Sequence, residues 1–349
     1  MSSFSINGRS IGPGHPTYII AELSANHRQD FQQAVRLVEA AKEAGADAVK
    51  LQTYTPDTIT IRCDSPEFVH GNESLWAGRS LYNLYAEAYM PWEWQPKLKR
   101  VADDLGMELF STAFDLTAVE FLEQIDIPIH KIASFELVDL ALIRKVAQTS
   151  KPVIMSTGMA SLAEIDEAVR AFREASGIQL ALLKCTSAYP APPEEMNLRT
   201  IPHLVQAFRV PVGLSDHTLG IAVPVAAVAL GACIIEKHFT LSRSELGPDS
   251  AFSLEPHEFE AMVGAVRTAE KALGGVNYDL TEKEKASRVF RRSLFVVQDM
   301  KAGDLFTDQN VRSIRPGHGL PPKCFSDVAG RKAVRDIQRG TPLTWKLIT

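Results

Sequence analysis

The sequence predicts an α/β protein: a (β/α)8 TIM barrel of residues 1–275 followed by a small, mostly-β domain. Two observations support this prediction. Eight short apolar runs alternate with amphipathic segments up to about Gly275, and the pattern then changes to short strands and turns. Strands that alternate with helices favour a parallel sheet, and eight such units favour a closed barrel. An open doubly wound sheet is the alternative fold, but no GxGxxG follows the first strand.

The predicted strands are rich in β-branched and large apolar residues. They comprise residues 17–23, 47–52, 107–112, 129–134, 152–157, 180–186, 210–215 and 233–239. Between them, segments such as 30–45 and 161–176 carry apolar residues three and four positions apart, which is typical of amphipathic helices. Glycine or proline follows where such a helix should end.

The connection after the second strand is unusually long. Residues 53–94 carry six aromatic side chains in their second half: Trp76, Tyr82, Tyr85, Tyr89, Trp92 and Trp94. The three tyrosines lie three and four residues apart, on one face of a possible helix. This face either packs against the barrel or forms a lid, because a long loop after a barrel strand lies on the active-site face.

The last quarter of the chain follows another pattern. Residues 276–290 are rich in charge and predict a linker. Residues 291–349 contain short strands and turns, with no predicted helix longer than a turn or two. They predict a separate small domain.

The composition is that of an ordinary globular protein, at 349 residues, 45% hydrophobic and 23% charged. A net charge of −5 without a long Lys/Arg run argues against a nucleic-acid partner. The longest apolar run, residues 221–235, is too short for a bilayer and contains Pro224 and Gly231, so no membrane span is expected. A polar amino terminus and four widely spaced cysteines predict a cytoplasmic protein with reduced thiols.

Every predicted strand ends in polar side chains although its body is apolar. These ends carry Glu22, Asn26 and His27; Lys50 and Gln52; Ser111 and Thr112; Lys131 and Ser134; Ser156 and Thr157; Lys184, Thr186 and Ser187; Ser215, Asp216 and His217; and Glu236, Lys237 and His238. Since the carboxyl ends of barrel strands meet on one face, they predict a shared polar cavity.

Side-chain alternation along a strand refines this set. Ser215 faces the same way as His217, and Glu236 the same way as His238, whereas Lys237 points to the other face and is left out of the site. By the same alternation, Lys184 would point to the face opposite to Ser187 and Tyr189, so its role stays open.

Two kinds of chemistry suit these residues. His217 and His238 end neighbouring strands and could hold a divalent metal such as Mn²⁺, Co²⁺ or Mg²⁺, although single histidines at strand ends are more often structural. Lys50 and Lys131 could bind a compact polyanion with the hydroxyl groups of Thr112, Ser134, Ser156 and Ser215. The alternative for each lysine is a side chain that extends to solvent at the barrel rim.

Seven motifs resemble those of the sialic acid synthase family. They are IAELSANH (20–27), KLQTYTPDT (50–58), KIASFE (131–136), MSTGM (155–159), KCTSAYP (184–190), GLSDHT (213–218) and EKHFTL (236–241). The tail from Arg291 is similar to the SAF domain of these enzymes, which is itself similar to type III antifreeze protein. Within the family, ELSANH, QTYTPD and residues 75–94 look most like the pseudaminic acid synthases, because sialic and legionaminic acid synthases usually carry a glycine in the first motif.

The resemblance implies a reaction between phosphoenolpyruvate and an amino sugar, here 2,4-diacetamido-2,4,6-trideoxy-L-altrose. A divalent metal on His217 and His238 would polarise the sugar aldehyde, the enol carbon would attack it, and water would add before phosphate leaves. N-acetylneuraminic or legionaminic acid synthesis is the alternative within the family. A metal-dependent aldolase or lyase and a non-catalytic sugar-binding protein are the alternatives outside it.

The resemblance also implies roles for individual residues. Phosphoenolpyruvate would be held by Lys50, Gln52, Thr112, Lys131, Ser134, Ser156, Ser187 and Ser215. Ser187 departs from the asparagine of sialic acid synthases, so its role is the least secure of these. The sugar would face Asn26, Tyr189 and Asp249, with Glu22 orienting it or moving a proton. The family further implies a homodimer in which each SAF domain covers the partner's barrel and Arg315 reaches the partner's sugar.

Overall fold

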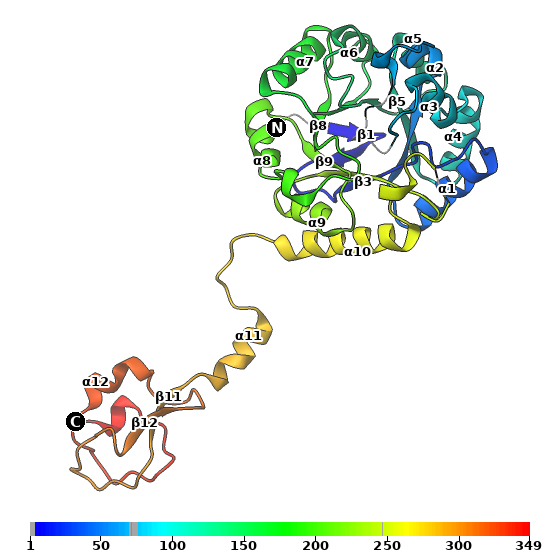
Figure 1. Ribbon diagram of the computed structural model, residues 1–349. Helices are drawn as coiled ribbons and strands as arrows, with labels where there is room; N and C mark the ends of the chain where they lie inside the picture. Colours follow the sequence, from blue (N-terminus) through cyan, green and yellow to red (C-terminus); the bar gives the residue numbers. More distant parts are fainter. Residues whose placement is uncertain (1–3, 70, 72–75, 246) are drawn as a thin grey trace. The chain divides into compact units, whose positions relative to one another are not determined.

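The computed structural model describes residues 4–69, 71, 76–245 and 247–349. The chain divides into two compact units, Met1–Gly274 and Gly275–Thr349. The first unit contains a closed barrel of eight parallel strands in the order β10-β3-β4-β5-β6-β7-β8-β9 (Figure 1). The predicted fold is therefore confirmed.

All eight predicted barrel strands are present, each within a few residues of its expected bounds. They are β3 (Tyr18–Glu22), β4 (Ala48–Thr53), β5 (Glu108–Ala113), β6 (His130–Ile132), β7 (Val153–Ser156), β8 (Leu180–Cys185), β9 (Val212–Asp216) and β10 (Ile234–His238). The helices around them are α1 (Phe31–Glu43), α4 (Gln95–Asp104), α5 (Leu116–Gln124), α6 (Leu140–Ala147), α7 (Leu162–Glu174), α8 (Thr200–Phe208), α9 (Ala222–Ala229) and α10 (Pro256–Leu273).

Local signals set where these helices begin. Asp30 caps α1 by accepting hydrogen bonds from the backbone N–H groups of Gln32 and Gln33. Ser161 and Glu164 form a capping box at the start of α7. Buried side chains then recur three and four residues apart, as at Ala34, Leu37, Val38 and Ala41 of α1, so each helix presents an apolar face to the barrel.

Strand register brings three distant residues together. His238 of β10 lies opposite Glu22 of β3, which in turn lies opposite Lys50 of β4. Residues in register on parallel strands point to the same face, and here that face is the barrel interior. Closure of the barrel between its first and last strands therefore creates the centre of the polar cavity.

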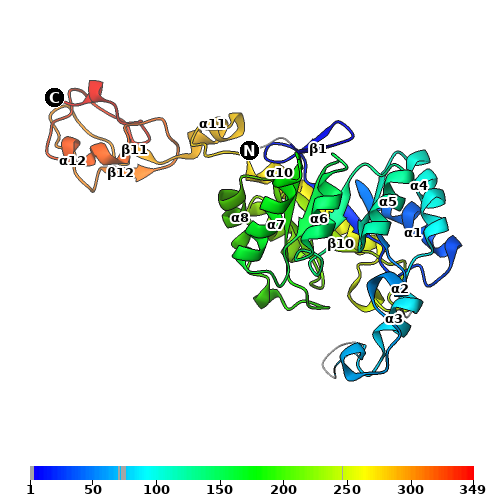
Figure 2. The same cartoon turned by 90° about the horizontal axis from the view of Figure 1, so that it is seen from above.

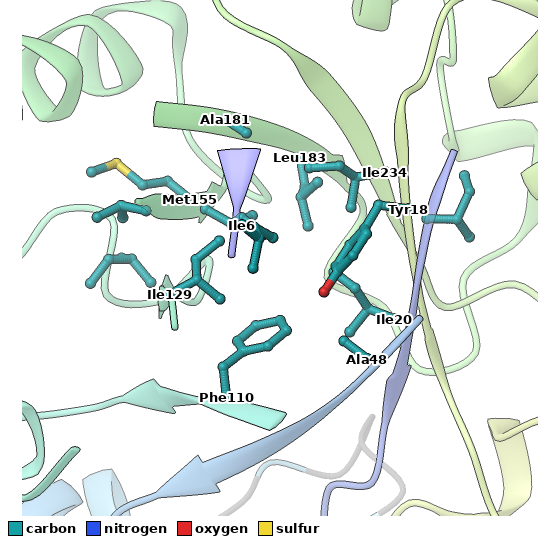
Figure 3. Packing of buried hydrophobic residues seen from close by; sticks show 14 of the residues in the cluster. Ile6, Tyr18, Ile20, Ala48, Phe110, Ile129, Met155, Ala181, Leu183 and Ile234 are labelled. Atoms are coloured by element: carbon teal, nitrogen blue, oxygen red, sulfur yellow. The ribbon is translucent and has the colours of Figure 1, made fainter. Parts of the chain in front are cut away.

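A short hairpin closes the other end of the barrel. β1 (Phe4–Ile6) and β2 (Arg9–Ile11) pair antiparallel, and Asn7 and Gly8 between them have φ values of 45° and 79°. Figure 3 shows Ile6 surrounded by Tyr18, Phe110 and Ile129. This hairpin was not among the predicted strands, although an Asn-Gly pair between short apolar runs favours one.

The insert after β4 lies at the opposite end of the barrel from the hairpin (Figure 2). It contains α2 (Pro56–Ile59) and α3 (Leu81–Ala88). The Tyr85 ring of α3 packs edge-on against Tyr54 with 5.7 Å between ring centroids, and Trp92 donates a hydrogen bond to the Tyr54 carbonyl. The insert is thus packed on the carboxyl-terminal face of the barrel.

The second unit has a core of its own. It contains the helices α11 (Glu282–Ser287) and α12 (Phe325–Val328) and the antiparallel strands β11 (Ser293–Val296) and β12 (Val311–Ile314). Leu294, Val296, Phe306 and Leu343 are among its buried residues. Helix α11 falls inside the segment predicted as a linker, where Thr281 and Glu284 form a capping box. No helix in the described part of the chain is long and apolar enough to cross a membrane.

Candidate active site

A buried ionic triad lies at the centre of the polar face. The ammonium of Lys50 is 2.8 Å from a carboxylate oxygen of Glu22 and 2.8 Å from one of Glu236. All three side chains are at most 6% exposed. Gln52 extends the cluster, because its Nε2 donates to Glu22 Oε1 at 3.2 Å and to Ser24 Oγ at 3.1 Å.

Burial and charge act differently on the three members of the triad. Burial raises the pKa of Glu22 to about 7, although Lys50 opposes this shift. For Glu236, burial would also raise the pKa, but Lys131 and Lys50 together lower it. For Lys50, burial alone would lower the pKa, but the two carboxylates raise it, so the ammonium stays charged. Glu22 is therefore the member that can change its protonation state near neutral pH.

Lys131 occupies a different environment. Its Nζ donates to Ser156 Oγ at 2.7 Å and to the Ile132 carbonyl at 2.9 Å, and no carboxylate of the described residues forms an ion pair with it. Burial lowers its pKa to about 8. The Thr112 hydroxyl, on the neighbouring strand in register with Lys131, is buried without a hydrogen-bond partner among the described residues. Such an unused donor beside a lysine suits an anionic ligand.

Ser134 and Ser187 lie together across Gly158. The Gly158 N–H donates to Ser134 Oγ at 3.0 Å. A Cβ on Gly158 would lie 2.3 Å from Ser187 Oγ and 2.7 Å from Ser134 Oγ, so only glycine fits between the two hydroxyl groups. The close approach of backbone and hydroxyl groups is typical of a cradle for phosphate.

His217 and His238 lie side by side, with 5.4 Å between ring centroids. The Nδ1 of His217 is 2.9 Å from the Thr186 carbonyl. When Nδ1 carries the proton and donates it to this carbonyl, the lone pair of Nε2 is free to bind a ligand. The Nδ1 of His238 is buried without a hydrogen-bond partner among the described residues. Burial lowers the pKa of His238 well below its usual value, so its ring is neutral.

These two imidazoles fit a divalent metal that takes its other ligands from water or substrate. The orphaned ring nitrogen of His238 and the carbonyl behind His217 are the observations that support the fit. Within the described residues, no group of three or more His, Cys, Asp or Glu side chains could hold a metal ion. The metal therefore stays a prediction.

Two of the residues assigned to the sugar, Tyr189 and Asp249, lie near the histidine pair. The Tyr189 ring packs against His217 with 4.3 Å between centroids, and Phe252 lies 5.1 Å from Tyr189. Asp249 accepts a short hydrogen bond from Ser24 Oγ, and burial raises its pKa. Trp76 of the insert also reaches this region: its ring is 6.3 Å from that of Tyr189, and its Nε1 donates to the Pro248 carbonyl.

Asn26 has a more internal position than the other sugar candidates. Its Nδ2 donates to the Phe239 carbonyl at 2.8 Å and to Ser253 Oγ at 2.9 Å, and the residue is 2% exposed. These bonds tie the loop after β3 to the loop after β10. A contact between Asn26 and the sugar stays a prediction.

Two lysines at strand ends point away from the cavity. Lys237 pairs with Asp216 on the outer face of the barrel, as alternation predicted. Lys184 donates to the Cys185 carbonyl at 2.7 Å and to Thr186 Oγ1 at 3.2 Å. Arg315 belongs to the second unit, directly after β12, and its predicted reach to a sugar stays a prediction.

Glu136 is a candidate site residue that the strand pattern did not predict. Burial raises its pKa to about 7, against the opposing charges of Lys131 and Lys50. Its Oε2 is buried without a hydrogen-bond partner among the described residues. The KIASFE motif contains this residue, but it lies beyond the strand end, where alternation gives no direction.

The comparisons with known proteins show the family to which the chain belongs. Residues 37–278 match the model of the NeuB family, and residues 291–349 match that of the SAF domain. The chain belongs to the NeuB family. The resemblance to sialic acid synthases is therefore confirmed.

Three relatives match nearly all of the chain. It is 47% identical to a pseudaminic acid synthase of Campylobacter jejuni, over 93% of this chain and 95% of the relative. It is 43% identical to the pseudaminic acid synthase of Helicobacter pylori, over 94% and 97%. Identity to the N,N'-diacetyllegionaminic acid synthase of Legionella pneumophila is 36%, over 99% of both chains.

A solved structure supports the fold of both parts of the chain. The spore coat polysaccharide biosynthesis protein spsE of Bacillus subtilis has a TM-score of 0.69 and 34% sequence identity. The match covers 100% of this chain and 99% of that protein.

Proposed function

We propose that this NeuB-family protein is a pseudaminic acid synthase, which condenses phosphoenolpyruvate with 2,4-diacetamido-2,4,6-trideoxy-L-altrose to give pseudaminic acid and phosphate. One observation carries the choice of sugar. Identity to pseudaminic acid synthases from two genera is 43–47%, against 36% for the legionaminic acid synthase. The polar face of the barrel supports the chemistry.

The side of the barrel formed by β4 to β8 suits phosphoenolpyruvate. Lys131 supplies a buried positive charge, and Thr112, Ser134, Ser156 and Ser187 supply hydroxyl groups. Ser215 bonds to Glu236 at 3.3 Å, at the junction with the ionic triad. These residues would bind and orient the phosphate and carboxylate groups so that the enol carbon faces the histidine side of the cavity.

The other side of the cavity suits the sugar. Glu22 lies between Lys50, Gln52 and the loop that carries Ser24. With a pKa of about 7, it can hold or release a proton at a sugar oxygen at neutral pH. Tyr189 and Trp76 present aromatic surface, which suits the 6-methyl group of a 6-deoxy sugar better than a hydroxymethyl group.

His217 and His238 would hold a divalent metal, which supplies Lewis-acid activation of the aldehyde when bound. We expect chelation to abolish activity and Mn²⁺, Co²⁺ or Mg²⁺ to restore it. His217→Ala should remove most turnover and leave the circular dichroism spectrum unchanged. Full turnover by a protein proved free of metal would remove this role.

A substrate panel tests the proposed function. Purified enzyme would be incubated with phosphoenolpyruvate and, separately, the diacetamido sugar, N-acetylmannosamine and the legionaminic acid precursor. The expected result is a product of pseudaminic acid mass, with equimolar phosphate release, from the diacetamido altrose alone. Turnover of N-acetylmannosamine instead would assign a sialic acid synthase, and product without phosphate release would assign a lyase.

The swapped homodimer is part of the proposal. Residues 276–349 contain 14 Lys/Arg and 8 Asp/Glu, whereas residues 1–275 contain 23 and 34, so the second unit is basic and the barrel acidic. Opposite charge favours docking of one unit on the other, in the same subunit or in a partner. All four cysteines are free thiols, which suits the predicted cytoplasmic location.

A further inference from the structure

The outer faces of β9 and β10 carry a buried ion pair directly behind the two histidines. Asp216 and Lys237 lie in register on the neighbouring strands, and both side chains have an exposed fraction of 0%. Among the ion pairs of the described residues, no other has both side chains fully buried. Asp216 immediately precedes His217, and Lys237 immediately precedes His238, so alternation turns each histidine into the cavity.

The pair also holds the residue that follows His217. Lys237 Nζ donates short hydrogen bonds to Asp216 Oδ2 and to the Thr218 carbonyl. Asp216 in turn accepts the Thr218 N–H at 3.0 Å and the Thr218 hydroxyl at 3.1 Å. Both chain neighbours of His217 are therefore bound to one side chain, which comes from the strand that carries His238.

Stability alone gives a weak reason for charges at this position. A buried ion pair can often be replaced by apolar residues without loss of stability, since desolvation opposes the attraction. The outer face of β4 and β5 has a similar buried cluster without charges: Thr53 Oγ1 lies 2.6 Å from Ser111 Oγ and 2.9 Å from Gln95 Oε1. The Asp216–Lys237 ion pair lies where β9 ends, at the point where the chain turns and the His217 side chain must still point into the cavity.

We propose that Asp216, Lys237 and Thr218 form a clamp that positions His217 and His238 as a pair of metal ligands. The inference rests on the proposed function for the presence of the metal, but the clamp acts on the two rings in the metal-free protein as well. The three are positioning residues, because none of them faces the cavity. Outer residues that orient metal ligands are known to contribute strongly to metal affinity.

The test uses a charge-free clamp in the full chain. The double variant Asp216→Asn/Lys237→Met keeps the side-chain volumes and an acceptor for the Thr218 N–H, but it removes the bonds from Nζ. Thr53→Val/Ser111→Ala is the matched control, since it disrupts a buried outer-face cluster at strand ends that carry no histidine. Thermal unfolding and circular dichroism establish that both variants fold.

Two measurements then report on the clamp. Titration of chelator-treated protein with Mn²⁺ should show an affinity roughly 10- to 100-fold weaker in the clamp variant and near parental in the control. Histidine Cε1–H resonances of the metal-free proteins should move or broaden for His217 and His238 in the clamp variant alone. Assignment uses His217→Gln and His238→Gln.

The outcomes separate the clamp from the metal. Unchanged resonances and unchanged Mn²⁺ affinity in a folded clamp variant would overturn the inference. Displaced resonances in the clamp variant, together with a parent protein that binds no Mn²⁺, would support the clamp and reject the metal of the proposed function.

If the double variant does not fold, Thr218→Val carries the same test. It removes only the hydroxyl bond to Asp216, so a change in the same direction but of smaller size is expected, and no change would overturn the inference.

Discussion

Lys50 and Lys131 are both buried in the barrel mouth, but burial affects them differently because their partners differ. Two carboxylates balance the ammonium of Lys50 and raise its pKa, whereas Lys131 donates to a hydroxyl and a carbonyl and burial lowers its pKa to about 8. Lys131 is thus the positive charge that remains available to an anionic substrate.

The first prediction concerns the pH dependence of phosphoenolpyruvate use. As pH rises through about 8, free enzyme loses the charge on Lys131, so kcat/KM for phosphoenolpyruvate should fall. Ser156→Ala removes an acceptor for the ammonium, which should move this fall to lower pH. The measurement is a profile from pH 6.5 to 10 for both proteins. A flat profile up to pH 10 would contradict the assignment.

The lowered pKa of Lys131 also affects stability, which should increase with pH where activity decreases. The folded protein holds the pKa of Lys131 below the value of an unfolded chain, so between about pH 8 and the unfolded value near 10.5 it binds fewer protons. The contribution of this residue to the free energy of unfolding therefore increases with pH across that window. Activity and stability should consequently diverge above pH 8.

At the scale of elements, the insert between β4 and α4 joins the site through Trp76. Its indole bonds to the loop before Asp249 and lies near Tyr189, while Trp92 at the other end of the insert packs on Phe121 of α5. The sequence left two interpretations, packing against the barrel or a lid. The structure shows packing contacts and also places one aromatic residue beside the proposed sugar subsite.

The second prediction follows from that position. Trp76→Ala should raise KM for the diacetamido sugar about 2- to 12-fold, because it removes aromatic contact worth roughly 0.5–1.5 kcal/mol beside the subsite. KM for phosphoenolpyruvate should stay within about twofold, since its proposed site lies on other strands. Tyr82→Phe is the control, because its hydroxyl contacts Asp57 in the insert. Equal effects on both substrates would indicate general loss of structure instead.

The third prediction concerns the hairpin at the opposite end of the barrel. Ile6 is 1% exposed within the core, so Ile6→Ala should lower the free energy of unfolding by about 2–5 kcal/mol. Both KM values should be unchanged below the unfolding transition, because the hairpin lies at the other end from the site. Denaturant unfolding and steady-state kinetics measure the two effects. A large change in either KM would show that the hairpin also shapes the site.

At the scale of the whole molecule, the prediction is that Arg315 acts in the partner's site. Arg315→Ala and His217→Ala proteins, each inactive, would be mixed and allowed to exchange subunits. In a mixed dimer one site would collect both lesions and the other neither, so part of the activity should return. Native mass spectrometry would verify exchange. Activity that stays at the level of the single variants after verified exchange would reject the swapped arrangement.

The sequence alone determined the barrel and the face that carries the site. Alternation of apolar runs and amphipathic segments is a local property, so all eight strands could be predicted within a few residues. Alternation along each strand placed Lys50, His217 and His238 in the cavity and Lys237 outside it. The family motifs then implied roles for these residues that no periodicity could indicate, and those roles stay predictions.

Only the tertiary structure decided which side chains meet. Glu22, Lys50 and Glu236 form one triad because the barrel closes between β3 and β10, a register that no single strand encodes. Asn26 joins two loops, and Glu136, on the loop beyond β6, has a pKa that burial raises against the charges of Lys131 and Lys50. Loop direction and long-range register depend on packing of the whole barrel. A side chain's face can therefore be read locally, whereas its partners and its pKa cannot.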